Sequence, residues 1–477
     1  MAAALLASGD EASGGVLAAL VLGSAVVPVP AAVREAFRAA GLSHALAASG
    51  FHLTVLMGAV MAVGRAAPRP LRWSLALGAM ALFLLLAGPQ PSVVRAVAMG
   101  AVAFGVEESG RRVRPLGVLL LCTLVMLLAA PAWLLDVGFQ LSVAATAGLL
   151  VSAAPLERAL TAPLPAWAAA AIAVPLAASL WTLPLQLLHF GALTLYAVPA
   201  NLLAAPLLTP LTLGAMAMAV AAVLLPPLLP PLAWAVVPLT RLFIGLAHTT
   251  AGLPLAQVQV GAMPVGLVGL LSLALLPWLL PLTCLTAGRR RLLRAAGGPL
   301  LAVVIVLQLI RIGGDQLLVV HDGRRDLLLA RHGGRGALIS RRADGLSCSQ
   351  GRQLAGAVGV QRYDWILLLD PVPAERPDCW RALTPTLLAQ QDGSPPLQPG
   401  QRLASPGLSV TPLTADSQAL GLQAGRRHWT LLPDRQAWWS WRRSGRGRHR
   451  NGRTLWLGFT PTAAERNRLP APDGPRP

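Results

Sequence analysis

The sequence predicts a mainly α-helical polytopic membrane protein, with about nine or ten spans, some broken or re-entrant, and a small α/β soluble domain at its C-terminus. Two observations carry this prediction. Of the 477 residues, 55% are hydrophobic and only 12% are charged, which is about half the charged fraction of an average soluble protein. The charges are also unevenly spread, because residues 1–312 hold 16 Arg and 7 acidic residues whereas residues 313–477 hold 23 Arg and 13 acidic residues. The first part therefore has the composition of a membrane domain, and the second approaches that of a soluble domain.

The same composition excludes other classes of protein. Disordered chains are poor in Leu, Val and Ile, in which this chain is rich. Four cysteines in a chain of this length do not make a disulfide scaffold. All 39 basic residues behind the net charge of +19 are arginines. We attribute that usage to a GC-rich genome and give it little functional weight.

Ten apolar segments approach the ~20 residues that a helix needs to cross a bilayer. Residues 1–40 are expected to precede them as an interfacial or re-entrant lead-in, because the stretch that begins at residue 12 is apolar and turns amphipathic around Arg34, Glu35 and Arg38. The transmembrane domain is then residues 41–312. Its expected spans are 42–64, 71–88, 91–106, 115–131, 134–153, 165–189, 195–224, 230–252, 262–286 and 295–312.

Arginine clusters predict the orientation of these spans, because cytoplasmic loops carry the excess of positive charge. The clusters follow the first, third, fifth and ninth spans, so they all lie on one side of the membrane. The tenth span then carries residues 313–477 outside, although one additional helix in the count would reverse this. The clustered residues are Arg65, Arg69, Arg72, Arg111, Arg112, Arg114, Arg158, Arg289, Arg290, Arg291 and Arg294.

Polar residues inside the expected spans are functional candidates, because each costs about 2.5–3.5 kcal/mol to insert. The first group is Ser43, His44, Ser49, Gly50 and His52. An unbroken helix would place the two histidines near one face, whereas a break at Ser49 and Gly50 would free backbone groups to line a cavity. The alternative is two histidines hydrogen-bonded between packed helices.

A second and a third group follow. Arg95 comes after Ser92, near the start of an expected span, and snorkelling to the membrane surface is the alternative to a functional role. Asp136 begins another span, which we expect it to cap. We also hypothesise that Asp136 pairs with Arg95. Deeper in the same run lie Gly138, Gln140 and Ser142.

The fourth group contains Pro184, His189, Asn201 and Pro206. Prolines and an asparagine so close together predict a broken span, which is tolerated at membrane depth where it lines a cavity or is buried in protein. An ordinary proline kink is the alternative.

Taken together, these runs resemble the competence transmembrane domain of the ComEC-type DNA-internalisation family, over about residues 15–290. The first run matches a Gly-Leu-Ser-His-Leu-Leu-Ala-x-Ser-Gly-Leu-His signature, from which it departs at Ala45 and Phe51. The elements that match in the family's order are Gly41–His52, Ser92–Ala96, Gly138–Ser142, Pro184–Gly191 and Asn201–Pro206.

The resemblance implies a channel subunit that imports single-stranded DNA across the bacterial cytoplasmic membrane during natural transformation. It implies single-stranded DNA, membrane lipid, a separate DNA receptor and a separate cytoplasmic motor or helicase as partners. The motor must be another protein because this chain has no nucleotide-binding Gly-x-x-x-x-Gly-Lys motif. No cofactor is expected, and a homo-oligomer remains open. The alternatives are a membrane-bound nuclease or hydrolase that uses His44 and His52, and a transporter of a smaller anionic solute.

The sequence departs from the family pattern at both ends. Further N-terminal spans and a small OB-like β-domain usually precede the position of Gly41, and we expect this chain to lack them through a misassigned start, a fragment or true reduction. Many family members end in a metallo-β-lactamase-like domain, whose His-x-His-x-Asp-His cluster holds two metals. Residues 313–435 are predicted to be a reduced, degenerate form of this fold without metal, so nuclease activity is not expected. Its histidines, which have no such spacing, include His321 and His332. Expected strands lie at 319–323, 327–334 and 365–371.

Residues 436–477 form a Trp- and Arg-rich segment that we expect to be partly disordered. Aromatic stacking beside a basic track is how proteins grip single-stranded nucleic acid, and the alternative is a Trp-rich strand in the core followed by a solvated loop. The candidate DNA contacts are Trp438, Trp439, Trp441, Arg442, Arg443, Arg446, Arg448, Arg450 and Arg453. Outside the membrane, a disulfide between Cys348 and Cys379 is chemically feasible, whereas Cys122 and Cys284 are expected to be intramembrane packing residues.

Overall fold

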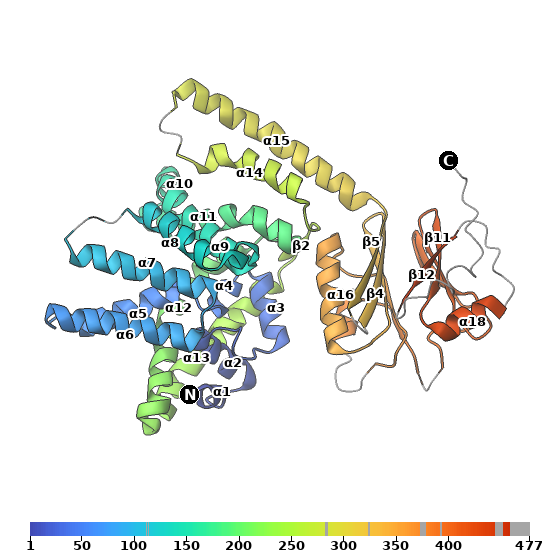
Figure 1. The fold of residues 1–477 in the computed structure, drawn as a ribbon, viewed down its shortest axis with the longest axis horizontal. Coiled ribbons are helices and arrows are strands. Elements are labelled where there is room, and N and C mark those ends of the chain that lie inside the picture. The colour runs from blue at the N-terminus through green and yellow to red at the C-terminus, as the bar shows by residue number, and fades with distance from the viewer. Residues whose placement is uncertain are drawn as a thin grey trace. The chain divides into compact units, whose positions relative to one another are not determined.

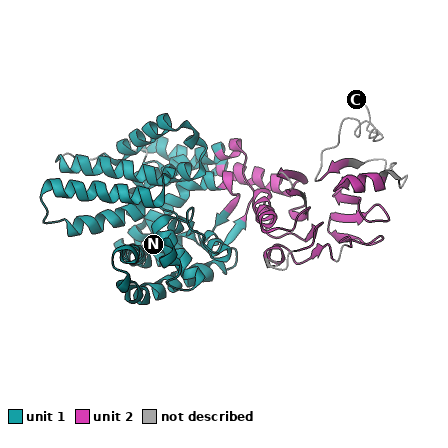
Figure 2. Cartoon of the chain, turned by 60° about the horizontal axis from the view of Figure 1, so that its bottom comes forward, with its two compact units in different colours: residues 1–186, 193–258, 269–300 teal, residues 187–192, 259–268, 301–477 magenta. Residues whose placement is uncertain are grey.

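The computed structural model describes residues 1–110, 112, 114–281, 285–322, 325–372, 378–391, 394–443 and 452–457. These residues form two compact units (Figure 2). The membrane unit comprises residues 1–186, 193–258 and 269–300, and the C-terminal unit comprises residues 187–192, 259–268 and 301–477.

The elements up to residue 313 are almost all helical, and those beyond it are mainly strands (Figure 1). The first set is α1 (Ala2–Leu6), α2 (Glu11–Leu22), α3 (Ala31–Ala39), α4 (Ser43–Leu46), α5 (Gly50–Val63), α6 (Arg69–Ala87), α7 (Pro91–Glu108), α8 (Pro115–Ala129), η1 (Pro131–Leu135), α9 (Val137–Gly148), η2 (Leu149–Ala153), α10 (Ala154–Leu160), α11 (Ala166–His189), β1 (Ala192–Thr194), α12 (Ala197–Leu224), η3 (Pro226–Leu228), α13 (Leu229–Ala251), β2 (Gln257–Gln259), α14 (Val265–Leu279) and α15 (Ala287–Gly313). The second set is β3 (Gln316–Asp322), β4 (Arg325–His332), β5 (Arg335–Ser340), α16 (Gly345–Val358), β6 (Trp365–Leu368), α17 (Asp378–Leu383), β7 (Leu387–Ala389), β8 (Leu403–Ser405), β9 (Leu408–Pro412), β10 (Leu420–Ala424), β11 (Arg427–Leu432), α18 (Arg435–Arg443) and β12 (Gly452–Trp456).

Every expected span coincides with helix, which confirms the polytopic helical fold class. Six helical stretches among the described residues are long and apolar enough to cross a membrane. They are α6, α9 continued through η2 and α10, α11, α12, η3 continued through α13, and α15. The helices α5, α8 and α14 are apolar but shorter. The sequence count of nine or ten spans therefore includes helices that do not reach full spanning length by themselves.

The N-terminal lead-in is part of the core of the membrane unit. All residues from Ser13 to Leu22 in α2 are buried, and α2 packs against α12 and α13. The amphipathic helix α3 follows the sequence expectation, because Phe37 is buried against Phe243 with a ring-centroid distance of 5.0 Å while Arg34 and Arg38 are exposed. An interfacial position therefore does not fit α2, which is apolar on every side and needs a buried environment.

The C-terminal unit contains two five-stranded sheets, ordered β3-β4-β5-β6-β7 and β12-β11-β10-β9-β8. Alternate residues of β4 face opposite ways, as the two-residue period of a strand requires. Leu328 and Ala330 pack in the core with Val410 and Leu422 of the second sheet, whereas Leu327 belongs to a separate core with residues of α16 and α17. The second sheet carries α18 on its other face, where side chains of β11 and α18 share a small cluster. The layer order is thus helix, sheet, sheet, helix, and the strands expected at 319–323, 327–334 and 365–371 are present.

The described residues beyond 435 pack with the second sheet of the C-terminal unit. Strand β12 pairs in parallel with β11, with Thr454 opposite Thr430. The Trp-rich stretch is the helix α18, where the sequence analysis considered a strand. The described part of residues 436–477 therefore completes the second sheet and covers it.

Candidate functional site

The first motif run contains a helix break. Helix α4 ends at Leu46 and α5 begins at Gly50, so His44 and His52 lie on different helices rather than on one face of a single helix. Ser49 has the extended conformation of an N-cap residue, but its side chain makes no cap hydrogen bond. Its Oγ instead lies 3.1 Å from Nδ1 of His52. Of the two interpretations offered by the sequence, the structure has the break at Ser49 and Gly50.

The two histidines differ in their surroundings. His52 is 1% exposed, and its Nε2 has no hydrogen-bond partner among the residues that the structure describes. His44 is exposed, as is its neighbour Ser43. A buried imidazole nitrogen without a partner costs free energy in the absence of a ligand or ordered water. His52 is therefore the member of this run whose position calls for a partner.

Arg95 is buried in the membrane unit, with 7% of its surface exposed. This burial argues against snorkelling, which would leave the guanidinium in water. Its Nε donates to Oγ of Ser142 over 2.9 Å, and its Nη1 lies 3.3 Å from Sδ of Met99. The arginine thus has neutral partners.

The hypothesis that Arg95 pairs with Asp136 is wrong. Asp136 Oδ1 accepts a hydrogen bond from the backbone N–H of Phe139 over 2.7 Å, so the carboxylate caps α9 as expected. Asp136 is exposed, and no ion pair joins it to Arg95 within the described part of the chain. A carboxylate that is already satisfied by a helix N-terminus gains little by leaving it.

Three motif runs nevertheless meet around the N-terminus of α5. Oγ of Ser92, in α7, donates to the carbonyl oxygen of Ala48 over 3.3 Å. A Cβ placed on Gly50 would lie 4.0 Å from Nη2 of Arg95. Because Arg95 also reaches Ser142 in α9, residues from α5, α7 and α9 surround one place in the membrane unit. We call these side chains, Ser49, His52, Ser92, Arg95 and Ser142, the polar cluster.

The remaining residues of the third run lie at the edge of this arrangement. Gln140 is half-buried, and its Nε2 donates to the carbonyl oxygen of Leu134 over 2.7 Å. Gly138 is exposed in the first turn of α9. Both residues lie in the first turn of α9, where the amide of Gln140 ties this turn to Leu134.

The fourth run joins segments of the chain and does not contain the predicted break. Helix α12 runs without interruption from Ala197 to Leu224 with Pro206 inside it, so the asparagine–proline stretch is a continuous helix. Nδ2 of Asn201 donates to the carbonyl oxygens of Ala197 over 2.7 Å and Gly41 over 3.4 Å. The helical structure is interrupted earlier, between the end of α11 at His189 and the start of α12 at Ala197, where β1 lies. Asn201 therefore ties α12 to the loop before α4.

His189 belongs to the C-terminal unit, whereas the polar cluster belongs to the membrane unit. Its neighbour Gly191 has φ +61°, and its carbonyl oxygen accepts from the backbone N–H of Val260 over 2.8 Å. A Cβ at Gly191 would lie 2.4 Å from the backbone nitrogen of Ala262. The Phe-Gly element is thus a tight backbone joint inside the C-terminal unit.

The Trp-rich helix contains one exposed tryptophan. Trp438 and Trp441 are 2% and 8% exposed and pack with Leu432 and Ala419, which corrects their assignment as DNA contacts. Trp439 is 48% exposed and lines a hollow of about 450 Å³ together with Asp416, Gln418 and Gln436. Arg442, Arg443 and Arg453 lie at the ends of α18 and β12, and Arg446, Arg448 and Arg450 lie outside the described residues.

Two histidines of the C-terminal unit each contact a different carboxylate. Nδ1 of His321, in β3, lies 2.6 Å from Oδ1 of Asp326, near the start of β4. His332 ends β4, and its Nδ1 lies 2.6 Å from Oδ1 of Asp315. The described residues contain no group of three His, Cys, Asp or Glu side chains that would hold a metal ion.

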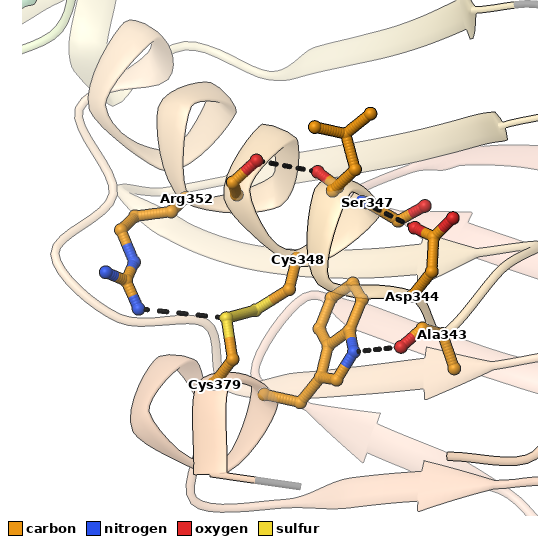
Figure 3. The surroundings of a disulfide bond; sticks show 9 residues. Ala343, Asp344, Ser347, Cys348, Arg352 and Cys379 are labelled. Carbon is orange, nitrogen blue, oxygen red and sulfur yellow. Dashed lines mark hydrogen bonds between the residues drawn. A yellow bond between two sulfur atoms is a disulfide. The ribbon is translucent and has the colours of Figure 1, made fainter. Parts of the chain in front are cut away.

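A disulfide joins α16 to α17 through Cys348 and Cys379, whose Cα atoms are 6.4 Å apart (Figure 3). Asp344 caps α16 beside it by accepting from the backbone N–H of Ser347 over 2.7 Å (Figure 3). Burial alone would raise the pKa of Asp344, but the hydrogen bonds from Ser347 and the nearby Arg325 outweigh it and hold this pKa below its usual value. The unit is therefore fastened covalently at the start of its covering helix.

The sequence analysis missed one buried cation. Arg331 in β4 is 2% exposed and donates to the backbone carbonyl oxygens of Arg311, Gly314 and Val358. Burial lowers the pKa of Arg331. The only signal in the sequence was an arginine that follows the apolar run 327–330 on an otherwise buried strand.

Comparison with known proteins identifies the membrane part. The competence protein family model matches residues 20–284. ComE operon protein 3 from Bacillus subtilis (strain 168) is 32% identical over 199 residues, which are 41% of this chain and 25% of that protein. The chain thus matches about a quarter of the length of this relative, and no solved structure matches it. The family model covers more than half of this chain, including all four groups of polar residues described above. The chain therefore belongs to the competence protein family.

Proposed function

We propose that this protein passes single-stranded DNA across the bacterial cytoplasmic membrane during natural transformation. Membership of the competence family supports a role in DNA uptake. The observation that favours a conducting role is the polar cluster, in which Arg95 and four polar side chains from three separate motif runs meet inside the membrane unit. A structural explanation would require only neutral contacts between helices, and it does not account for a buried cation.

The charge of the cluster suits this cargo. DNA carries one negative charge per phosphate, and hydrocarbon cannot solvate it, so a path through the membrane has to be polar and partly cationic. The hydrogen bonds and contacts that define the cluster connect Arg95 to a hydroxyl and a thioether rather than to a carboxylate. An anion that reaches this place would meet a positive charge that is not already neutralised.

One helix supports a placement of the C-terminal unit on the outer side of the membrane. Helix α15 is 27 residues long, so at 1.5 Å per residue it extends about 40 Å and is long enough to span. Four arginines from Arg289 to Arg294 lie in its first turns, which favours a cytoplasmic start and an exit on the outer side. This argument does not depend on the number of spans before α15. The disulfide between Cys348 and Cys379 supports it, because such bonds persist in oxidising compartments.

Placed outside, the C-terminal unit would meet incoming DNA first. Its exposed Trp439 offers one stacking surface, and base–aromatic stacking is worth about 1–3 kcal/mol per base. The arginines from Arg442 to Arg453 follow directly in the sequence. We propose this corner as a contact for single-stranded DNA, with the receptor and the motor supplied by separate proteins.

The proposal is tested by DNA entry in the source organism. A deletion strain is complemented with the wild-type chain, with His52→Ala, or with His248→Ala, and uptake of labelled DNA into the cytoplasm is measured. His248 is an exposed histidine in α13, so His248→Ala is the matched control and should restore entry, whereas His52→Ala should not. Normal DNA entry in the deletion strain itself would refute the channel proposal. Loss of label processing with intact entry would instead favour the nuclease alternative.

A further inference from the structure

The N-terminus of α5 and the guanidinium of Arg95 lie beside each other in the membrane unit. The cap residue Ser49 leaves the first amides of α5 without a side-chain acceptor, because its hydroxyl bonds to the ring of His52 instead. Nη2 of Arg95 lies 4.0 Å from the position that a Cβ on Gly50, the first residue of α5, would occupy. Gly50 has no side chain between the helix end and the guanidinium, and a Cβ there would be in van der Waals contact with Nη2 of Arg95 and, at 3.7 Å, with Cβ of Ala96.

Two side chains at this place have a charge or a hydrogen-bonding atom without a partner among the described residues. Arg95 is 7% exposed and its contacts use Nε and Nη1, so its charge has no anionic partner among the described residues. The ring of His52 is 1% exposed and held against Ser49, with Nε2 unpartnered. If the Ser49 hydroxyl donates to Nδ1, the neutral ring carries its proton on Nε2 and presents a further donor.

Physical chemistry predicts what such a place binds. A helix N-terminus favours anions through its free N–H groups and its dipole, and arginine binds phosphate with two parallel hydrogen bonds. A buried cation without a counterion is strongly unfavourable. Oxygen atoms of one phosphate group would satisfy the amides, the guanidinium and the imidazole together.

We propose that the N-terminus of α5, Arg95 and His52 form a binding site for a single phosphodiester group, occupied by the backbone of single-stranded DNA as it crosses the membrane. The identity of this occupant rests on the proposed function, whereas the anion site itself does not. The site would hold one phosphate at a time and contact no base, so it would bind every sequence alike.

The test measures thermal stability of the purified full-length chain in phosphate-free detergent. Dimethyl phosphate is the probe. Trimethyl phosphate, which has a third methyl group in place of the negative charge, is the control ligand. The Tm of the wild-type chain should rise with the logarithm of the dimethyl phosphate concentration and stay constant with trimethyl phosphate. Arg95→Met should abolish the rise, and without phosphate its Tm should equal or exceed that of the wild type, because an uncompensated buried charge has been removed.

Matched variants separate this site from general effects of charge. Arg241→Met removes an exposed arginine of the same unit, whose side chain is 64% exposed, and should keep the wild-type response. Arg95→Lys keeps the charge without the planar fork and should bind dimethyl phosphate on the order of tenfold more weakly. Gly50→Ala keeps Arg95 but places a Cβ between the N-terminus of α5 and Nη2 of Arg95, so it should also weaken the response. This variant preserves the test if Arg95→Met does not fold.

The outcomes distinguish the site from the proposed function. If Arg95→Met or Gly50→Ala responds to dimethyl phosphate as the wild type does, the site is refuted whatever happens to DNA entry. If the response depends on Arg95 but the deletion strain imports DNA normally, the site stands and the DNA assignment falls. A short oligothymidylate should raise the Tm of the wild type but not of Arg95→Met. A response to phosphatidylglycerol with none to the oligothymidylate would assign the site to a lipid headgroup and overturn the nucleic-acid occupant.

Discussion

Two buried arginines show how differently this chain treats a charge taken out of water. Arg331 is surrounded by backbone carbonyl oxygens that accept hydrogen bonds from three of its nitrogens. The guanidinium of Arg95 instead contacts one hydroxyl group, of Ser142, and one thioether sulfur, of Met99. Since carbonyl groups at helix ends need donors, Arg331 is explained by the architecture of the C-terminal unit. Arg95 has no comparable set of acceptors, and this contrast is the reason why we propose a ligand for Arg95 and a structural role for Arg331.

Replacing Arg331 should therefore destabilise the C-terminal unit. In Arg331→Met the carbonyl oxygens of Arg311, Gly314 and Val358 lose their donor. Each buried acceptor left without a donor lowers the free energy of unfolding by up to about 1–3 kcal/mol. We expect a lower Tm of the full-length chain and faster hydrogen exchange at the ends of α15 and α16. The response of the membrane unit to dimethyl phosphate should not change. Unchanged exchange at both helix ends would contradict the role assigned to Arg331.

The helix cap at Asp344 predicts a dependence on pH. Because hydrogen bonds hold the pKa of Asp344 below its usual value in the folded state, the carboxylate stabilises the fold above about pH 4. This contribution is lost as pH falls through the lowered pKa. Asp344→Ala should cost about 1 kcal/mol at neutral pH, measured as hydrogen exchange of α16, and the difference from wild type should vanish in acid.

Asp344→Asn is the matched control, since an asparagine oxygen still accepts from the backbone N–H of Ser347 but pairs with no cation. It should retain most of the stability at neutral pH and show little dependence on pH. A cost in Asp344→Ala that stays constant down to the lowest pH would show that the carboxylate charge has no part in the cap.

At the scale of elements, the tight joint around Gly191 is the place where a small change should have a large effect. Gly191→Ala forces an alanine into a left-handed conformation, which costs about 1–2 kcal/mol by itself, and places Cβ 2.4 Å from the backbone nitrogen of Ala262. We expect a marked fall in the Tm and in the yield of folded protein. Gly266→Ala in α14, where no atom lies within 4 Å of the added Cβ, should be neutral or stabilising by about 0.5–1 kcal/mol. Equal yields of the two variants would contradict the joint.

The elements also show how far a sequence can be interpreted. Helix positions followed from runs of apolar residues, because a bilayer requires them, and the first strands of the C-terminal unit followed from short apolar runs bounded by turn residues. The helix break at Ser49 was one of two interpretations that the residues allowed. The break expected near Asn201 was wrong, since Pro206 sits in a continuous helix whose neighbours tolerate it. Proline marks a restriction on the backbone, not a chain reversal.

The candidate site was predictable only in part for a related reason. The spacing of polar residues within apolar runs singled out Arg95 and His52, but no local pattern states which run lies beside which. The hydroxyl of Ser142, 47 positions away, took the place that the sequence had suggested for Asp136. The burial of Trp438 and Trp441 likewise depends on where α18 packs. Contacts between distant segments are set by tertiary packing. The sequence could therefore single out the candidate residues but not the residues that they contact.

At the scale of the whole molecule, the orientation proposed from α15 predicts the labelling of single cysteines in intact cells. Gln401→Cys lies on an exposed position of the C-terminal unit, and Gly288→Cys lies at the exposed start of α15. A membrane-impermeant maleimide should label the first without permeabilisation and the second only after it. The endogenous Cys348 and Cys379 should not react unless a reductant is added, since they form a disulfide. The reverse pattern of labelling would place the C-terminal unit in the cytoplasm and remove the incoming DNA as its partner.

The burial of α2 has a consequence for synthesis. Its residues Ser13–Leu22 rest on α12 and α13, and α12 begins at Ala197. At about 5–20 residues per second, a ribosome needs roughly 10–40 s to make the intervening chain. For that time α2 can contact only the earlier elements that also pack against it, among them α1, α4 and α6. The core around α2 can therefore close only after α13 has been synthesised, late in the making of the membrane unit.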